Sequence, residues 1–65
     1  MLKGEIDMER KYEAYADNGR DFITFDFYST HRANSKANIE DAKREYRLKH
    51  GHSIKVINTY RSFVE

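Results

Sequence analysis

The chain has 65 residues, enough for one small domain that on folding buries about 60% of the surface its unfolded form exposes. It lacks cysteine, which excludes disulfides and thiolate metal sites and suits a reducing compartment such as the cytoplasm. No segment approaches the roughly 18 apolar residues of a membrane span, and the N-terminal sequence lacks the apolar run of a signal peptide. A membrane protein is therefore not expected.

The net charge is only +1, but the charges are unevenly distributed. Residues 1–28 carry four basic and seven acidic groups, whereas residues 29–65 carry eight basic and four acidic groups. Such an asymmetry is a hint of binding to nucleic acid or to an acidic partner. Solvated charged faces are the more ordinary explanation of the same pattern.

The first expected element is a strand over about residues 2–16 with a bend near Arg10. Its first half alternates apolar or small residues with charged ones, which is the period of a half-buried strand. A helix remains an alternative for its second half, because Met8, Tyr12 and Tyr15 would share one helical face. The bend is expected because Arg10 would otherwise lie on the apolar side of the sheet.

The Asn18-Gly19 pair favours the strand, because both residue types tolerate the positive φ of a type I′ hairpin turn. A two-residue loop at this pair leads into a second strand over residues 21–29, which is rich in β-formers. One face of the hairpin is then mainly apolar and the other carries an ion pair. The expected opposite pairs are Ala14 and Ile23, Tyr12 and Phe25, and Arg10 and Phe27 on the apolar face, with Glu13 and Thr24, and Lys11 and Asp26, on the other face.

A helix is expected over about residues 36–50, with either Asn38 or Ser35 as its N-cap. Gly51 stands where a left-handed C-cap belongs. Acids near the start of a helix and bases near its end complement the helix dipole. The acids expected in the first turn are Glu40 and Asp41, and the bases expected in the last turn are Arg47, Lys49 and His50.

Residues 54–63 predict a third strand, since β-branched and aromatic residues dominate them. A right-handed crossover through the helix places this strand beside the first and antiparallel to it. The sequence therefore predicts a single α+β domain over residues 1–65, with the order β-β-α-β. Its antiparallel sheet of three strands has the spatial order second, first, third, and one helix packs on one face through Ile39, Ala42 and Tyr46.

The other face of the sheet is expected to hold Tyr15, Phe22 and Tyr28 with little to cover them. An uncovered aromatic patch usually marks an interface, so we expect self-association through this face, giving a homodimer. The alternative is that these are scattered surface aromatics, which are normal in small domains.

No signature of catalysis or cofactor binding is present. There is no cysteine nucleophile, no serine stands in a glycine-flanked elbow, and three glycines do not make a phosphate-binding loop. His31, His50 and His52 have no further ligand at a recognised metal-binding spacing. We therefore expect neither an enzyme, nor a cofactor, nor a metal site.

Nucleic-acid binding has a better physical basis, because a basic loop leads into a helix N-terminus whose free N–H groups can meet a phosphate. Glu40 and Asp41 oppose this role by repelling an anion, and the pI near 8.0 is below that of strongly basic binding domains. We place nucleic acid slightly ahead of the alternative, a protein-binding regulator or inhibitor that uses the aromatic face or an edge strand. The candidate phosphate-binding residues are Arg32, Lys36, Lys43, Arg44 and Arg47.

The segment HRANSKANIEDAKREYRLKHG, in a short chain without cysteine or proline, resembles the small open reading frames of bacteriophages and mobile elements. This resemblance implies a regulatory or host-directed binding role rather than a metabolic one. The β-β-α-β order is also similar to that of nucleic-acid-binding modules such as small ribosomal-protein domains and the arm-binding domains of phage integrases. That second likeness concerns the fold alone, and a fold hosts many functions.

Overall fold

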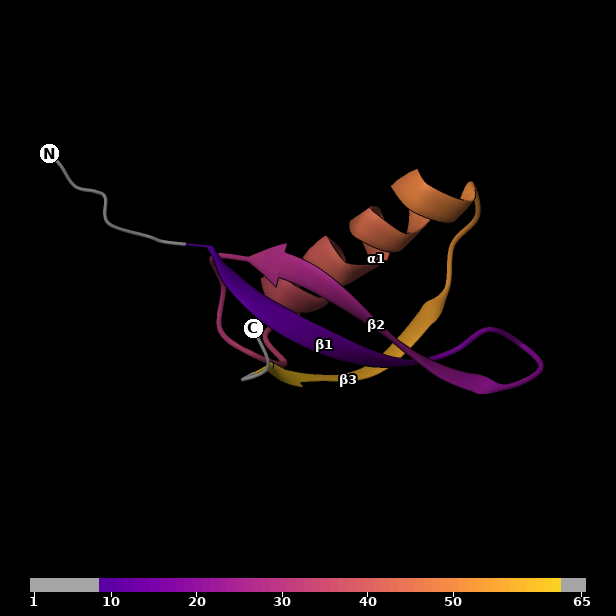
Figure 1. Ribbon diagram of the computed structural model, residues 1–65, viewed down its shortest axis with the longest axis horizontal. Helices are drawn as coiled ribbons and strands as arrows, with labels where there is room; N and C mark the ends of the chain where they lie inside the picture. Colours follow the sequence, from indigo (N-terminus) through magenta and orange to yellow (C-terminus); the bar gives the residue numbers. More distant parts are fainter. Residues whose placement is uncertain (1–8, 63–65) are drawn as a thin grey trace, which may run out of the picture.

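The computed structural model describes residues 9–62 and has its elements in the order β-β-α-β. The strands form one antiparallel sheet in the order β2-β1-β3, and α1 lies across one face of it (Figure 1). The predicted α+β class, the strand order and the helix range are confirmed. In the described part of the chain, no helix is long and apolar enough to cross a membrane. The elements are β1 (Arg10–Asp17), β2 (Phe22–Ser29), α1 (Lys36–His50) and β3 (Lys55–Arg61).

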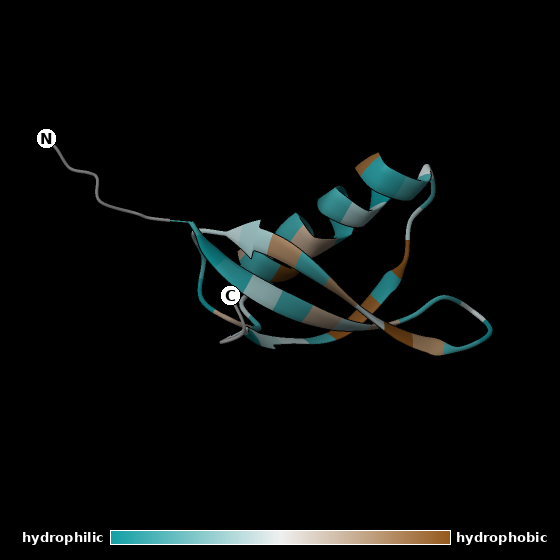
Figure 2. Ribbon diagram, in the orientation of Figure 1, coloured by the Kyte–Doolittle hydropathy of each residue, from teal (hydrophilic) through white to brown (hydrophobic). Residues whose placement is uncertain are grey.

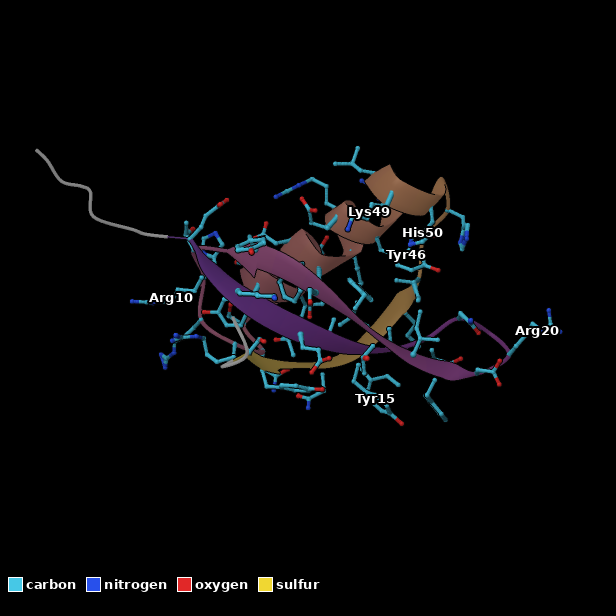
Figure 3. The ribbon with its side chains drawn as sticks, in the orientation of Figure 1. Arg10, Tyr15, Arg20, Tyr46, Lys49 and His50 are labelled. Atoms are coloured by element: carbon cyan, nitrogen blue, oxygen red, sulfur yellow. The ribbon has the colours of Figure 1, made fainter. Side chains whose placement is uncertain are left out.

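Within the described residues, β1 begins at Arg10 and ends at Asp17, one residue beyond the predicted end. The helical alternative for this part of the chain is wrong, while residues 2–8 of the predicted strand lie outside the described residues. Arg10 pairs regularly with Ser29, so the bend expected there does not appear as a shift in register. Its side chain is exposed at the end of the sheet (Figure 3), which removes the conflict that suggested a bend.

The hairpin loop is longer than predicted. Residues 18–21 separate the two strands, so Ala14 lies opposite Phe25 instead of opposite Ile23. The predicted register is therefore wrong by two residues along the second strand. Because side chains alternate with a period of two, this shift leaves every side chain on its predicted face.

Hydrogen bonds to side chains explain the longer loop. Asn18 does not adopt the positive φ that a type I′ turn requires, whereas Gly19 has a φ of 94°. The Asn18 Oδ1 atom instead accepts hydrogen bonds from the backbone N–H groups of Arg20 and Asp21, each at 2.8 Å. The Asp17 carboxylate accepts the N–H of Gly19 at 2.8 Å. These short polar side chains satisfy the backbone of a four-residue loop.

The core lies between the sheet and α1. Alanines at the centre of β1 let the helix approach closely, and Phe25 at the edge packs its ring 5.2 Å from that of Tyr46. Ile39, which was predicted to face the sheet, is only half-buried. Figure 2 shows that α1 is mostly hydrophilic and that the hydrophobic segments lie mainly in the strands. The buried apolar side chains are Tyr12, Ala14, Ala16, Phe27, Ala42, Tyr46 and Ile54.

The N-cap of α1 is Ser35, whose Oγ atom accepts the N–H of Asn38 at 3.2 Å. The alternative cap, Asn38, is wrong because this residue lies inside the helix and is fully buried. The earlier start also moves Glu40 and Asp41 out of the first turn, which contains no acidic residue. That part of the dipole argument is therefore wrong as well.

The C-terminal end of α1 is as predicted. Gly51 adopts the left-handed conformation with a φ of 79°, and its N–H donates to the carbonyl of Arg47 at 2.8 Å. Arg47, Lys49 and His50 occupy the last turn, where positive charge is favourable.

A buried polar network fixes the loop between β2 and α1. Asn34, with a φ of 63°, exchanges two hydrogen bonds with Thr59 of β3: its N–H donates to Oγ1 at 2.7 Å, and its Oδ1 accepts the Thr59 N–H at 2.9 Å. The Thr59 hydroxyl in turn donates to Asn38 Oδ1 at 2.5 Å. Asn38 Nδ2 closes the network by donating to the carbonyl of His31 at 3.0 Å. The loop therefore has a defined position against the sheet.

Candidate functional site

The sheet has one face that α1 does not cover, and we call it the exposed sheet face. Its side chains follow from the alternation along the strands, since Tyr12, Ala14 and Ala16 point to the core. Tyr15 points away from α1 (Figure 3). The side chains on this face are Lys11, Glu13, Tyr15, Asp17, Phe22, Thr24, Asp26, Tyr28, Lys55, Asn58 and Tyr60.

Large aromatic side chains on this face are open to solvent. The exposed fractions are 37% for Tyr15, 61% for Phe22, 55% for Tyr28 and 39% for Tyr60. Tyr15 and Phe22 stack, with ring centroids 5.3 Å apart and planes inclined by 16°. The three residues predicted to be uncovered, Tyr15, Phe22 and Tyr28, are thus found exposed, while their role as an interface stays a prediction.

A β-bulge in β3 adds one more apolar side chain at this sheet. Tyr15 lies opposite Asn58 and Ala16 opposite Val56, so Ile57 is the extra residue. Ile57 is exposed. The bulge restores the alternation on either side of it, which places Thr59 in the core and Tyr60 on the exposed sheet face.

A row of polar groups crosses the middle of the exposed sheet face. Glu13 of β1 lies directly opposite Asp26 of β2 on one side and opposite Tyr60 of β3 on the other. Two carboxylates in this position destabilise a sheet. Lys11 compensates Asp26, with Nζ 3.5 Å from Oδ2. The predicted ion pair of these two residues is therefore present, but it runs diagonally, because Lys11 lies opposite Tyr28.

Glu13 is compensated differently, by a phenol. The Tyr60 hydroxyl donates a hydrogen bond to the Glu13 carboxylate, and this bond raises the pKa of Tyr60 above its ordinary value of 10.0. Partial burial and the negative charges of Glu13 and Asp26 raise the pKa of Tyr60 further. Among the described residues, Glu13 forms no ion pair. The middle of the face therefore carries a carboxylate for which residues 9–62 supply no ion-pair partner.

The predicted basic residues do not form one cluster. Arg32 lies in the loop, where its carbonyl accepts hydrogen bonds from Ser35, and Lys36 is the first residue of α1. By helical periodicity, Lys36, Lys43 and Arg47 share one side of α1, and Arg44 lies about a quarter turn away. The structure thus brings three of the five residues to one side of the helix.

Two of the five basic side chains form ion pairs with acidic residues of the same helix. Arg44 Nη2 lies 2.7 Å from Asp41 Oδ1, and Lys43 Nζ lies 3.9 Å from Glu40 Oε2. Asp41 is held in turn by the Ser29 hydroxyl, which donates to its Oδ2 at 2.6 Å. Asp41 therefore joins α1 to β2 through Ser29, and its ion pair with Arg44 reduces the availability of Arg44 to a phosphate.

A half-open hollow of about 200 Å³ lies beside β2 and the last turns of α1. The rings of His50 and His52 both contact Tyr46, with centroid distances of 4.3 and 5.4 Å. This arrangement is an aromatic cluster at a helix end, where a positive imidazole is favourable. Within residues 9–62, no group of three or more metal-ligating side chains is found. The hollow is lined by Phe25, Asp26, Glu45, Tyr46, Lys49 and His50.

Comparison with known proteins does not assign this site. No protein-family model, no curated protein and no solved structure matches the chain.

The sequence did not predict that Glu13, Asp26 and Tyr60 are neighbours. The alternation of side chains along the hairpin already puts Glu13 and Asp26 on the same face. The predicted two-residue loop, however, placed Thr24 instead of Asp26 opposite Glu13. Tyr60 requires the pairing of β1 with β3, and the bulge at Ile57 alters the alternation that a simple count would use. With the correct loop length and bulge position, the sequence would have predicted the row of Glu13, Asp26 and Tyr60.

Proposed function

We propose that this protein is a non-enzymatic binding protein whose contact surface is the exposed sheet face and whose partner is a protein. The observation that carries the proposal is the stacked and exposed pair of Tyr15 and Phe22 on a face that α1 leaves uncovered. Tyrosine and phenylalanine are enriched at protein interfaces, where they supply a large contact area at low entropic cost.

The charges of the exposed sheet face also favour a protein over nucleic acid. Among the described residues, this face carries the carboxylates of Glu13, Asp17 and Asp26 and the ammonium groups of Lys11 and Lys55, so carboxylates outnumber ammonium groups. A phosphate backbone is attracted by an excess of positive charge. The aromatic rings of this face are therefore poorly placed for stacking on the bases of a nucleic acid.

Nucleic acid is the second candidate partner, through the basic side of α1. One observation favours it: because Ser35 caps the helix, Glu40 and Asp41 lie beyond the first turn, and Lys36 stands at the N-terminus without an ion pair in the described part of the chain. Arg47 has no described ion pair either. Among the ion pairs of residues 9–62, none involves Arg32, Lys36 or Arg47, so these three of the five candidates contribute the charge that a phosphate would meet.

We further propose that this protein is a small cytoplasmic regulator that acts by binding alone, without catalysis. A regulator of this kind accords with the resemblance to small phage and mobile-element open reading frames. A second copy of the chain is one partner that the aromatic face can take, and a homodimer is part of the proposal. Sedimentation over a wide range of concentrations measures that association.

The test is affinity capture with the full chain, from extracts treated and not treated with nuclease. We expect the same protein to be retained in both, and retention to fall when Tyr15 and Phe22 are both replaced by threonine, which keeps β-propensity. The matched control replaces Lys36 and Arg47 by serine on the opposite side of the domain. Retention that requires nucleic acid and is lost only in the control variant would overturn the proposal in favour of the second candidate.

The dependence of binding on salt concentration distinguishes the protein partner from the nucleic-acid partner in a second experiment. Binding of random-sequence DNA or RNA through phosphate contacts falls steeply with added salt. We expect no retention of the chain on either polymer at low salt. Retention with a steep salt dependence would support the basic side of α1 instead.

A further inference from the structure

The middle of the exposed sheet face has an electrostatic imbalance that the fold itself does not require. Glu13 lies between Asp26 and Tyr60 in one cross-strand row, and like charges directly opposite each other cost stability. Lys11 is directed to Asp26, at 3.5 Å, rather than to Glu13. A carboxylate is thus kept at the centre of the surface without a cation from the described residues.

Aromatic rings stand around this carboxylate. Tyr60 is directly opposite Glu13 on β3, and Tyr15 is two positions further along β1 on the same face. Both rings are more than a third exposed, so a group approaching from solvent reaches them. A cation over the face of such a ring is attracted by it, in addition to its attraction to the carboxylate.

The geometry of a guanidinium suits this combination better than that of an ammonium group. A guanidinium is planar, donates two parallel hydrogen bonds to one carboxylate and stacks on aromatic rings. Its hydration is also weaker, so less is lost when it leaves water for an interface. Carboxylate and phenol side by side therefore select arginine over lysine.

We propose that the middle of the exposed sheet face binds an arginine side chain of a protein partner, with the guanidinium on the Glu13 carboxylate between the rings of Tyr60 and Tyr15. This inference rests on the proposed function, because it names the chemistry of the partner at that same face. The raised pKa of Tyr60 is consistent with it, since its main cause is the hydrogen bond to the Glu13 carboxylate, and the negative charges of Glu13 and Asp26 add to it.

The experiment is an NMR titration of the full chain with N-acetyl-argininamide as the probe. Its neutral isostere, N-acetyl-citrullinamide, and N-acetyl-lysinamide serve as comparison probes. We expect saturable shifts centred on Glu13, Asp26 and Tyr60 with the arginine probe, and affinities about three- to fivefold weaker for the other two probes.

Two variants complete the test. Glu13→Gln keeps the hydrogen bond from Tyr60 and removes the charge, so binding of the arginine probe is expected to fall to the level of the citrulline probe. Glu40→Gln removes an exposed carboxylate of α1 and is expected to leave binding unchanged. Equal affinities for the arginine and citrulline probes, or unchanged binding by Glu13→Gln, would overturn the inference.

The outcomes separate this inference from the proposed function. If the arginine probe does not bind while the Tyr15 and Phe22 double variant still loses the captured protein, the inference fails and the proposed function survives. If that double variant retains the protein, the proposed function fails. A further outcome is that the arginine belongs to a second copy of the chain. The wild type then self-associates and Glu13→Gln does not, and this result would overturn the inference that a separate protein supplies the arginine.

Discussion

The hydroxyl of Thr59 donates a hydrogen bond to Asn38 Oδ1 at 2.5 Å, and both side chains are almost completely buried. This bond joins β3 to the first turn of α1, and the same two residues hold Asn34 and the carbonyl of His31. A buried polar network of this kind is stabilising only if every member is satisfied. The position of the loop and helix against the sheet therefore depends on it.

Replacing Asn38 by alanine leaves the Thr59 hydroxyl and the His31 carbonyl without their partner. We expect a loss of about 1–3 kcal/mol in the free energy of unfolding, measured by urea denaturation. A domain of this size has a total stability of about 3–10 kcal/mol, so the loss is a large fraction.

A double-mutant cycle with Thr59→Val isolates the bond itself. Because each single variant already breaks it, the two losses should not add, and the coupling should exceed about 0.5 kcal/mol. The control is Asn58→Ala, which removes only an exposed hydrogen bond from Asn34 and should cost less than about 0.5 kcal/mol. Strict additivity of Asn38→Ala and Thr59→Val would show that the bond does not link the two elements.

The Ser35 cap predicts a second stability effect. Ser35→Ala removes the acceptor of the Asn38 N–H, and we expect a loss of about 1 kcal/mol in the free energy of unfolding. Ser53→Ala is the matched control, since Ser53 is exposed and lies beyond the helix. Thermal denaturation of the two variants measures the difference, and equal midpoints would argue against Ser35 as the cap.

Tyr60 predicts a loss of stability at alkaline pH. The folded state raises the pKa of this phenol, mainly through the hydrogen bond to Glu13, so folding favours its protonated form. The resulting stabilisation is complete below the ordinary pKa of 10.0 and disappears as the pH rises through the higher folded value. Tyr60→Phe removes this contribution.

Urea denaturation at neutral pH and above pH 10.0 checks this prediction. The wild type should lose more stability than Tyr60→Phe over that interval, and in an absorbance titration the variant should form one tyrosinate fewer above pH 10.0. Tyr28→Phe, which alters an exposed phenol of the same face, is the control. A wild-type loss no larger than that of Tyr60→Phe would contradict the assigned hydrogen bond.

The fold was largely predictable because its signals are local and periodic. The alternation in β1 and β2, the helix with its glycine stop at Gly51, and the crossover rule together predicted the order β2-β1-β3. The two-residue error in register did not change any face, because it was even. This is why the exposure of Tyr15 and Phe22 was predicted despite a wrong loop.

The candidate site was less predictable, because the identity of neighbouring residues in it depends on which of several possible hydrogen bonds a polar side chain forms. Asn18 bonds the loop backbone instead of adopting a positive φ, and that choice brings Asp26 rather than Thr24 opposite Glu13. Asn38 looks like a cap in sequence but is a buried partner of Thr59, a contact between residues 21 positions apart. Such long-range polar pairs leave no periodic trace in a single sequence.

The most direct test of the exposed sheet face as the binding surface is calorimetric titration of the captured partner protein into variants of the chain. The account predicts that the double variant Tyr15→Thr, Phe22→Thr binds at least about tenfold more weakly, the expected loss when aromatic anchors are removed. It predicts that Lys36→Ser, Arg47→Ser binds within about twofold of the wild type. Unchanged affinity for the aromatic double variant together with a large loss for the basic one would contradict the account.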